Sequence, residues 1–443
     1  MLYHLYEAGN AALFGPRLGA QMVRASFTNP FNPLSYTPLG KTLAAGTEVF
    51  ERVTRRFGQP VWGLDSTVID GKDVDIEEEI IVEKPFCSLL HFKRDTDRND
   101  PKVLVVAPMS GHFATLLRGT IEALLPHHDV YVTEWVDSRQ VPLSKGDFSL
   151  DTYISYLRSF LSLLGGDSHV IAVCQPAVPV MAAVSLMAEE DDPNQPLTMT
   201  LMGGPIDTRI SMTAVNKLAE DKPLSWFEDT IVQTVPVFNQ GGLRKVYPGF
   251  LQLSGFMSMN LDRHIDSHKN FYKHLIQGDG ESAAGHRKFY DEYMAVMDIP
   301  ATYYIDTVDV VFQRHLLPKG EMEWLDPITG EKQLVDPSKI KKTALFTVEG
   351  ELDDISACGQ TTAAHVLCSN LAPEKQFHWL QRDVGHYGIF NGGRYRSQIM
   401  PRIRHLIRQF DKGLSPIPKS DLDIYPDLAP EQFDKKKHLD VVL

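Results

Sequence analysis

A strand that runs directly into a helix is the feature that most constrains the fold of this chain. The segment His169–Val173 is short and mostly apolar, as a buried strand requires, and a helix of small residues follows up to Glu190. Cys174 lies at the turn between them, and Pro176 stands two residues further on. Proline is tolerated in the first turn of a helix, where N–H groups have no partner. The segment therefore predicts a tight turn that presents one thiol above the end of a strand.

The position of Cys174 allows two interpretations. A helix N-terminus carries positive potential and free N–H groups, and both favour a thiolate and can lower the pKa of a cysteine. A reactive thiol at such a turn would attack an acyl group and form a thioester. The alternative is a buried apolar cysteine that ends a core strand, since free cysteine is among the most buried residues. The local segment alone leaves both interpretations open.

Short apolar strands alternate with helical segments on both sides of this turn. Such βαβα order predicts an α/β fold with a mostly parallel, doubly wound sheet. We expect strands at Ile76–Val82, Phe86–Phe92, Val103–Ala107, Val130–Glu134, His169–Val173, Leu197–Met202, Lys341–Glu349 and Gln376–Leu380. We expect helices at Ala114–Leu125, Asp151–Leu164, the segment up to Glu190, and near Arg396–Phe410.

The chain divides into five parts. Residues 1–75 form a helical extension, 76–205 the first half of the sheet, 206–340 an insertion, 341–411 the second half, and 412–443 a loosely ordered tail. The insertion lies between the sixth and seventh strands, where we expect it to cover the site as a lid. In the extension, Gly15-Pro16 should break the first helix. We expect the extension to pack on the core, with a dimer contact or a substrate contact as alternatives.

Aromatic residues and methionines are frequent in the insertion between Trp226 and Tyr272. We expect these side chains to form the core of the insertion itself. The alternative is a groove for an apolar polymer or a long acyl chain, and some of the residues could serve both purposes.

Charge and cysteine content exclude several classes of protein. The net charge of −13 over 443 residues disfavours a sequence-independent nucleic-acid binder, which needs a basic face. The four cysteines form no C-x-x-C pair, so we expect no metal site and no disulfide framework. The first residues have no basic start, and no apolar run reaches the roughly 18 residues of a membrane span. We therefore expect a cytoplasmic protein with no transmembrane segment and no cofactor.

Two residues downstream of Cys174 could complete a catalytic triad. A nucleophile needs a base, and the base needs an acid that orients it. Asp353 lies in a G-x-x-D turn after the seventh strand, and His386 follows the eighth. The order nucleophile, acid, histidine, each beyond the carboxyl end of a strand, resembles that of the α/β-hydrolases. We therefore predict a Cys174–His386–Asp353 triad, with Asp354 and Asp207 as alternative acids.

Two members of this triad also have a plainer interpretation. Asp353 could cap a helix that begins near Ile355, since aspartate is a common N-cap. His386 could be a surface histidine of a loop, because the chain contains 16 histidines. The position of the residues at the expected places, rather than their identity, favours the triad.

The oxyanion of an acyl-transfer reaction needs backbone N–H donors next to the nucleophile. Gln175, the residue after Cys174, should supply one N–H group, and the loop after the third strand should supply another. In that loop Ser110 is the preferred donor and Met109 the alternative. We expect His112 of the same loop to be satisfied by backbone groups rather than to contact substrate.

Six segments resemble the polyhydroxyalkanoate depolymerase family, and within it the intracellular poly(3-hydroxybutyrate) depolymerases. The segments are Val105–His112, Val173–Pro179, Met202–Arg209, Tyr247–Gln252, Val348–Ile355 and Gly385–Gly392. The resemblance covers about residues 1–411 and places the family's nucleophile, acid and histidine on Cys174, Asp353 and His386. It implies a cytoplasmic enzyme on amorphous polyhydroxyalkanoate granules that hydrolyses the ester bonds of poly(3-hydroxybutyrate) through a thioester.

Two other functions remain as alternatives. A polyhydroxyalkanoate synthase-like acyltransferase also uses a cysteine on this fold, but within G-x-C-x-G, whereas Ala172 and Pro176 stand at the two glycine positions here. A non-catalytic granule-coating protein would keep Cys174 only as a core residue, and the spacing of Asp353 and His386 disfavours this. The sequence is compatible with a homodimer and leaves the oligomeric state open.

Overall fold

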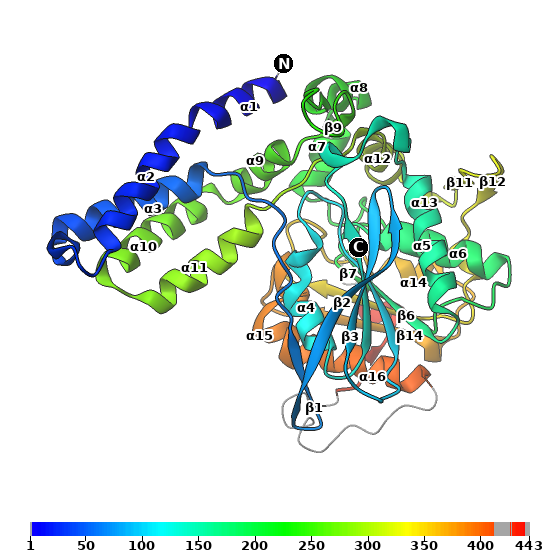
Figure 1. Ribbon diagram of the computed structural model, residues 1–443. Coiled ribbons are helices and arrows are strands. Elements are labelled where there is room, and N and C mark those ends of the chain that lie inside the picture. The colour runs from blue at the N-terminus through cyan, green and yellow to red at the C-terminus, as the bar shows by residue number, and fades with distance from the viewer. Residues whose placement is uncertain (1, 412–425, 427, 439–443) are drawn as a thin grey trace.

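A ten-stranded sheet forms the centre of the computed structural model, which describes residues 2–411, 426 and 428–438 (Figure 1). Its strands are β1 Ser66–Ile69, β2 Lys72–Lys84, β3 Cys87–Arg94, β4 Lys102–Val106, β5 Asp129–Trp135, β6 Ser168–Val173, β7 Thr198–Met202, β13 Ala344–Gly350, β14 Gln376–Gln381 and β15 Glu431–Gln432. Their order is β1-β2-β3-β5-β4-β6-β7-β13-β14-β15. The pairings from β5 through β14 are all parallel. The expected mostly parallel α/β sheet is therefore confirmed.

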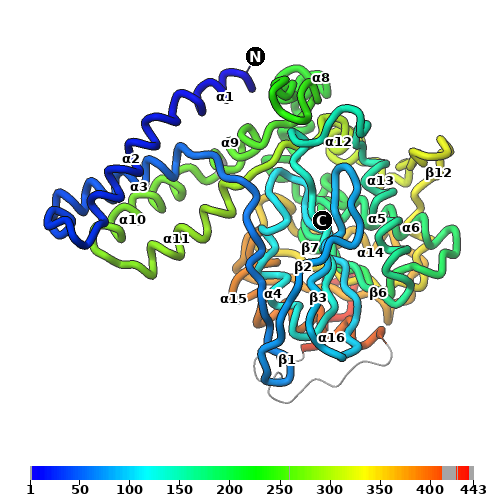
Figure 2. Tube along the Cα trace, in the orientation of Figure 1, coloured from blue at the N-terminus to red at the C-terminus, as the bar shows by residue number. Residues whose placement is uncertain are grey.

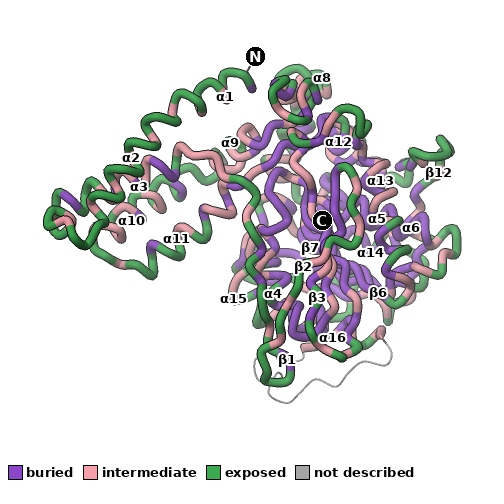
Figure 3. The backbone as a smooth tube through the Cα atoms, viewed as in Figure 1, coloured by how far each residue is buried: buried purple, intermediate pink, exposed green. Residues whose placement is uncertain are grey.

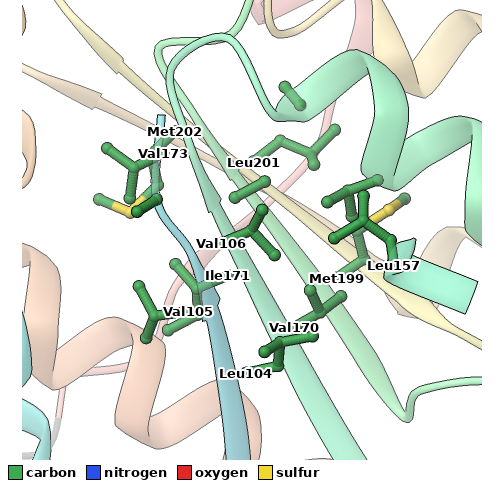
Figure 4. Packing of buried hydrophobic residues seen from close by; sticks show 14 of the residues in the cluster. Leu104, Val105, Val106, Leu157, Val170, Ile171, Val173, Met199, Leu201 and Met202 are labelled. Carbon is green, nitrogen blue, oxygen red and sulfur yellow. The ribbon is translucent and has the colours of Figure 1, made fainter. Parts of the chain in front are cut away.

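The central strands are buried on both faces. All six residues of β6 are buried. Figure 4 shows Val105 and Ile171 on one face of the sheet, and Val106 and Val170 on the other, beside Leu157 of a covering helix. Successive side chains of a strand point to opposite faces, so a strand covered on both sides is apolar throughout. This explains why β6 is an unbroken buried run up to the cysteine.

Helices cover the sheet on both sides. They are α4 Arg118–Leu124, α5 Leu150–Leu164, α6 Ala177–Glu189, α14 Ala364–Leu367, α15 Gly392–Arg394 and α16 Met400–Phe410. Helices α5 and α6 pack together on one side, and α4 and α15 lie on the other (Figure 1). The sheet is thus doubly wound, as expected.

The insertion leaves the sheet after β7 and returns at β13, and these two strands pair directly. Its helices are α7 Ala214–Asp221, α8 Leu224–Trp226, α9 Gly249–Met259, α10 Leu261–Gln277, α11 Gly280–Tyr293, α12 Ala301–Thr307 and α13 Leu316–Lys319. Short strands β8 Gln233–Thr234, β9 Lys245–Tyr247 and β10 Ile299–Pro300 form one small sheet, and β11 Glu323–Leu325 and β12 Lys332–Leu334 form another. The segment between β7 and β13, all of it described, adds no strand to the main sheet.

The N-terminal extension contains three helices. They are α1 Leu2–Ala12, α2 Phe14–Thr28 and α3 Pro38–Thr54. We expect the break at Gly15-Pro16, but the helix is interrupted at Leu13. Pro16 has no N–H for the carbonyl of Ala12, so the helix loses a hydrogen bond one turn before the proline. The helical part ends at Thr54, and strand β1 already lies within the expected extension.

The helices of the extension pack on the insertion, which differs from the expectation, whereas the segment after them packs on the core as expected, with Trp62 against Phe92. Helix α3 lies along α10 (Figure 2). Ion pairs join α3 to α11, with Arg287 Nε 2.6 Å from Glu48 Oε1 and Arg52 Nη2 2.7 Å from Asp291 Oδ1. The partner of α3 is therefore a helix pair that lies more than 200 residues away along the chain, which a local pattern cannot indicate.

Most of the expected tail, residues 412–443, lies outside the described residues. The described part contains β15, which pairs antiparallel with β14, and helix α18 Lys435–His438. The ring of Phe433 stacks on that of His365 with centroids 4.0 Å apart. This described part is held against the edge of the sheet rather than loosely ordered.

Candidate active site

Cys174 occupies a strained turn at the carboxyl end of β6. Its φ of 68° lies in the left-handed region, which residues with a Cβ seldom adopt. Its N–H donates to the carbonyl of Met202 at 2.7 Å, and its carbonyl accepts from the N–H of Ala177 at 3.1 Å. Strain of this kind, held by the surrounding structure, is typical of the nucleophile of a strand–helix turn.

Small residues make room for this turn. A Cβ on Gly204 would lie 2.1 Å from the Cβ of Ala177 and 3.1 Å from the carbonyl oxygen of Cys174. The segment after β7 therefore approaches the start of α6 closely only because it carries glycine. The Gly203-Gly204-Pro205 sequence thus ends a strand and also leaves space for the turn at Cys174.

Asp353 and His386 form a buried pair next to this turn. The ring Nδ1 of His386 lies 2.7 Å from Oδ2 of Asp353, with the two residues 5% and 7% exposed. The second oxygen of Asp353 accepts the N–H groups of Ile355 and Ser356 at 2.9 and 2.8 Å. The capping role considered for Asp353 is thus present as well, on the oxygen that His386 does not use.

The protonation of His386 depends on two neighbouring groups. Burial opposes the charged ring, but the charges of Cys174 and Asp353, and hydrogen bonds to both side chains, raise the pKa of His386 well above 6.5. A histidine with this environment accepts a proton readily. The structure thus brings Cys174, His386 and Asp353 together.

The two alternative acids lie elsewhere. Both carboxylate oxygens of Asp207 accept from the guanidinium of Arg209 at 2.8 Å. Among the described residues, neither Asp207 nor Asp354 has a hydrogen bond to His386. Asp353 is therefore the carboxylate that orients the imidazole.

A cavity of about 460 Å3 opens beside the cysteine. Cys174, Gln175, Ser110, Met109 and His386 all line it. Within the described part of the chain, no acceptor pairs with the backbone N–H groups of Gln175, Met109 or Ser110. These N–H groups could therefore donate to an oxyanion.

His112 lines the cavity without being free to react. Its Nε2–H donates to the carbonyl of Tyr293 at 3.0 Å, and the ring is fully buried. Burial lowers the pKa of His112 to about 4, so that the ring is neutral near pH 7. The expectation of a loop histidine satisfied by a backbone group agrees with this geometry.

The outer wall of the cavity comes from the insertion. It is mostly apolar and contains the side chains of Phe227, Tyr247, Phe256, Tyr304 and Phe312. Other aromatic residues of the insertion, such as Phe271, are buried away from the cavity. The aromatic set therefore divides between the core of the insertion and the wall of the site.

Two residues that position His386 and Asp353 are not evident from the sequence. Gly203, with φ of 57°, leaves no room for a side chain, because its Cβ would lie 3.2 Å from Cε1 of His386 and 3.3 Å from Oδ2 of Asp353. The buried carboxylate of Glu349 accepts the N–H groups of Gly359, Thr361 and Thr362 at 2.9 to 3.0 Å. Glu349 thereby holds the loop that carries Asp353. In the sequence, the only sign of this role is that a charged residue lies near the end of a buried strand.

Two features are absent from the part of the chain that the structure describes. The described residues contain no group of three or more His, Cys, Asp or Glu side chains that could hold a metal ion. Among their helices, none is long and apolar enough to cross a membrane.

The order of the strands and the place of the site define the class of this protein. Strands β4 and β5 exchange places between β3 and β6, the first strands are antiparallel, and the candidate residues follow β6, β13 and β14. This is the α/β-hydrolase fold. Residues 203–411 match the family described as PHB de-polymerase C-terminus. This match supports an ester-hydrolase function.

The solved structures that resemble the chain are distant. They include a 2-hydroxy-6-oxo-6-phenylhexa-2,4-dienoate hydrolase from Rhodococcus sp. (10% identity, TM-score 0.41, 76% of this chain and 99% of that chain). A hydrolase from Pseudomonas aeruginosa has 11% identity and a TM-score of 0.41 over 76% of this chain and 99% of its own. A thermophilic esterase from Thermogutta terrifontis has 11% identity and a TM-score of 0.38 over 76% and 100%. No curated protein matches the chain in sequence.

Proposed function

We propose that the chain hydrolyses the ester bonds of poly(3-hydroxybutyrate) through a thioester on Cys174. The observation that carries this proposal is the buried hydrogen bond from His386 to Asp353 beside the cavity that Cys174 lines. The match of residues 203–411 to the depolymerase family supports the polyester as substrate. The mainly apolar cavity suits an uncharged chain of ester units.

In the first half of the reaction, Nε2 of His386 takes the proton of the Cys174 thiol. Asp353 holds the ring with Nδ1–H directed at its carboxylate and stabilises the imidazolium that forms. The thiolate attacks the ester carbonyl, and the oxyanion accepts the N–H of Gln175 and of Ser110 or Met109. The C–O bond then breaks, the alkoxide end of the polymer takes the proton from His386, and a 3-hydroxyacyl thioester remains on Cys174.

In the second half, His386 takes a proton from water, and the resulting hydroxide attacks the thioester carbonyl. The C–S bond breaks, Cys174 recovers its proton from His386, and a 3-hydroxybutyrate monomer or oligomer leaves as its acid. The two half-reactions need only the residues of the chain, the ester and water. We place the reaction on amorphous polymer granules in the cytoplasm, as the family resemblance implies.

The test is the clearing of amorphous poly(3-hydroxybutyrate) granules, followed as loss of turbidity. We expect the wild type to clear them and Cys174→Ala not to do so. A 3-hydroxybutyryl adduct on Cys174, trapped by acid quench and located by peptide mass spectrometry, should be present in the wild type only. Clearance by Cys174→Ala at the wild-type rate would instead leave the cysteine as a core residue.

The synthase-like alternative is tested with 3-hydroxybutyryl-CoA. Polymer formation from this thioester would favour an acyltransferase, and hydrolysis without polymer would favour the depolymerase. Ala172 and Pro176, in place of the synthase glycines, lead us to expect hydrolysis.

A further inference from the structure

A helical arm extends from the side of the molecule that carries the insertion. We define the arm as α1, α2 and α3 together with α10 and α11, that is, residues 2–54 and 261–293 (Figure 1). Figure 3 shows the outer helices of this arm as mostly exposed, in contrast to the buried interior of the sheet region. The arm therefore presents a large surface to its surroundings.

Helix α2 is apolar on a side that nothing in the chain covers. None of its fifteen residues is buried. Phe14, Leu18 and Met22 are 67%, 44% and 62% exposed. Their spacing of four residues places them on one face of the helix. A surface helix normally turns such a stripe toward a core, so this stripe lacks a partner within the chain.

The exposed apolar surface continues around the tip of the arm. Phe31 is 93% exposed, and Leu34, Tyr36 and Leu39 are also largely exposed. Soluble monomers seldom expose contiguous apolar patches larger than a few hundred Å2. The exposed apolar side chains lie on α2, on the tip between α2 and α3, and on the start of α3. A helix of a second copy would cover only one of these faces. The partner is therefore a broad apolar surface.

The charge around α2 and the tip differs in sign from that of the chain. Residues 14–41 contain Arg17, Arg24 and Lys41 and no Asp or Glu, whereas the whole chain has a net charge of −13. The Arg17 guanidinium donates to the carbonyls of Leu13, Thr54 and Asn10 and to no carboxylate. Among the described residues, no carboxylate pairs with Lys41 either. Residues 14–41 are therefore suited to a surface with negative charge.

We propose that this arm docks the enzyme on the surface of its solid polyester substrate. The inference rests on the proposed function. Each ester cleavage leaves one carboxylate and one hydroxyl, so a polyester under hydrolysis is an apolar surface that carries negative charges. The apolar stripe of α2, the tip, and the cations Arg17 and Lys41, neither of which pairs with a carboxylate among the described residues, complement such a surface.

The arm is joined to the wall of the cavity. Helices α10 and α11 continue directly from α9, and Phe256 of α9 lines the cavity. From the arm, Tyr3 donates to Oδ2 of Asp298 at 2.6 Å, and Tyr6 stacks on Phe250 of α9 with centroids 4.1 Å apart. An enzyme that docks by its arm therefore brings the cavity, rather than the opposite edge of the sheet, close to the polymer.

The test measures binding apart from hydrolysis. In a Cys174→Ala background, we compare the parent with a variant that also carries Phe14→Ser, Leu18→Ser and Met22→Ser, by sedimentation with amorphous poly(3-hydroxybutyrate) granules. We expect the affinity to fall at least about tenfold, since each side chain loses part of its apolar burial. The matched control carries Leu143→Ser, Leu163→Ser and Ile328→Ser, which are exposed outside the arm, and should bind like the parent.

The same arm substitutions in the active enzyme provide a check on folding. Hydrolysis of a soluble 3-hydroxybutyrate ester should keep the wild-type kcat/KM, while granule clearance slows. Unchanged binding by the arm variant, or a wild-type dimer that the substitutions turn into a monomer without loss of binding, would overturn the docking proposal alone. Absence of binding and of clearance with the intact arm would overturn the docking proposal and the proposed function together.

Discussion

Strand β6 and helix α2 are both rich in apolar residues, yet they use them in opposite ways. All six residues of β6 are buried, and none of the fifteen residues of α2 is. The strand finds its partners inside the chain and thereby fixes the turn at Cys174. The helix leaves its apolar stripe exposed on the surface of the molecule. Changes near the sheet should therefore affect every ester alike, and changes in the arm should affect only the solid polymer.

The largest effect should follow from removal of the thiol. We expect Cys174→Ala to lower kcat/KM at least about 10⁴-fold on a soluble 3-hydroxybutyrate ester and on granules alike, since the nucleophile is lost. The control is Cys358→Ala, because burial raises the pKa of the Cys358 thiol to about 11 and keeps it unreactive. Initial rates in a pH-stat measure both. A rate within tenfold of wild type for Cys174→Ala would contradict the role of Cys174 as nucleophile.

The next effect concerns the acid. Asp353→Asn removes the charge that orients and stabilises the imidazolium, and we expect kcat to fall about 10²- to 10⁴-fold on both kinds of substrate. It should also lower the pKa of His386, seen as a shift of the rate profile with pH. Asp207→Asn is the matched control, because its carboxylate binds Arg209. Equal losses in the two variants would contradict the assignment of Asp353 as the acid.

A smaller effect should follow from Gly203→Ala. A Cβ at this position would lie 2.6 Å from Cδ1 of Ile389 and 3.2 Å from Cε1 of His386, at a φ of 57°. We expect a loss of about 1–3 kcal/mol in the free energy of unfolding and about a tenfold lower kcat. Urea unfolding and initial rates measure the two. Gly393→Ala, with open space around its Cβ, should change neither.

The smallest effect concerns the joint between arm and insertion. Burial, and the nearby charge of Asp137, raise the pKa of Asp298 from 3.8 to about 6. A group whose pKa is raised on folding contributes stability below its unfolded pKa, and this contribution is lost as the pH rises through the folded value. The folded structure around Asp298 should therefore lose roughly 1–3 kcal/mol of stability between about pH 4 and pH 6.

Hydrogen exchange of α1 across this pH range, corrected for intrinsic rates, measures the effect. Asp298→Asn should flatten the pH dependence, and Tyr3→Phe should speed exchange at each pH because the hydrogen bond to Asp298 is lost. Hydrolysis of a soluble ester should not change in Tyr3→Phe. A slowed soluble reaction would show that the arm and the site are coupled more tightly than the comparison of β6 and α2 implies.

The sheet could be predicted from the sequence because its signals are local. Each parallel strand is a short apolar run, and Asp353 and His386 follow strands in the order that the fold requires. The extra strands β1 and β15 escaped prediction because edge strands are short and only partly apolar. The partner of α3 escaped prediction because an apolar helix face does not indicate which surface covers it.

Within the site, the residue types were predictable and their supports were not. Cys174 and His386 stand out by chemistry and position. Gly203 supports them only through the space that its missing side chain leaves, and Glu349 through hydrogen bonds to a loop ten residues further on. Both depend on distances between separate segments of the chain. A local pattern contains no information on such distances.

The direct pairing of β7 with β13 separates the sheet from the insertion. Thr198 to Met202 align in parallel with Ala344 to Val348, so the insertion leaves at the carboxyl end of one strand and returns at the amino end of the strand beside it. The entropy of closing a loop grows only slowly with its length, so a longer or shorter segment at this point costs the sheet little. The insertion can therefore change in length while the pairing of β7 with β13 is kept, and the outer wall of the cavity can change with it while the ends of β6, β13 and β14 stay the same.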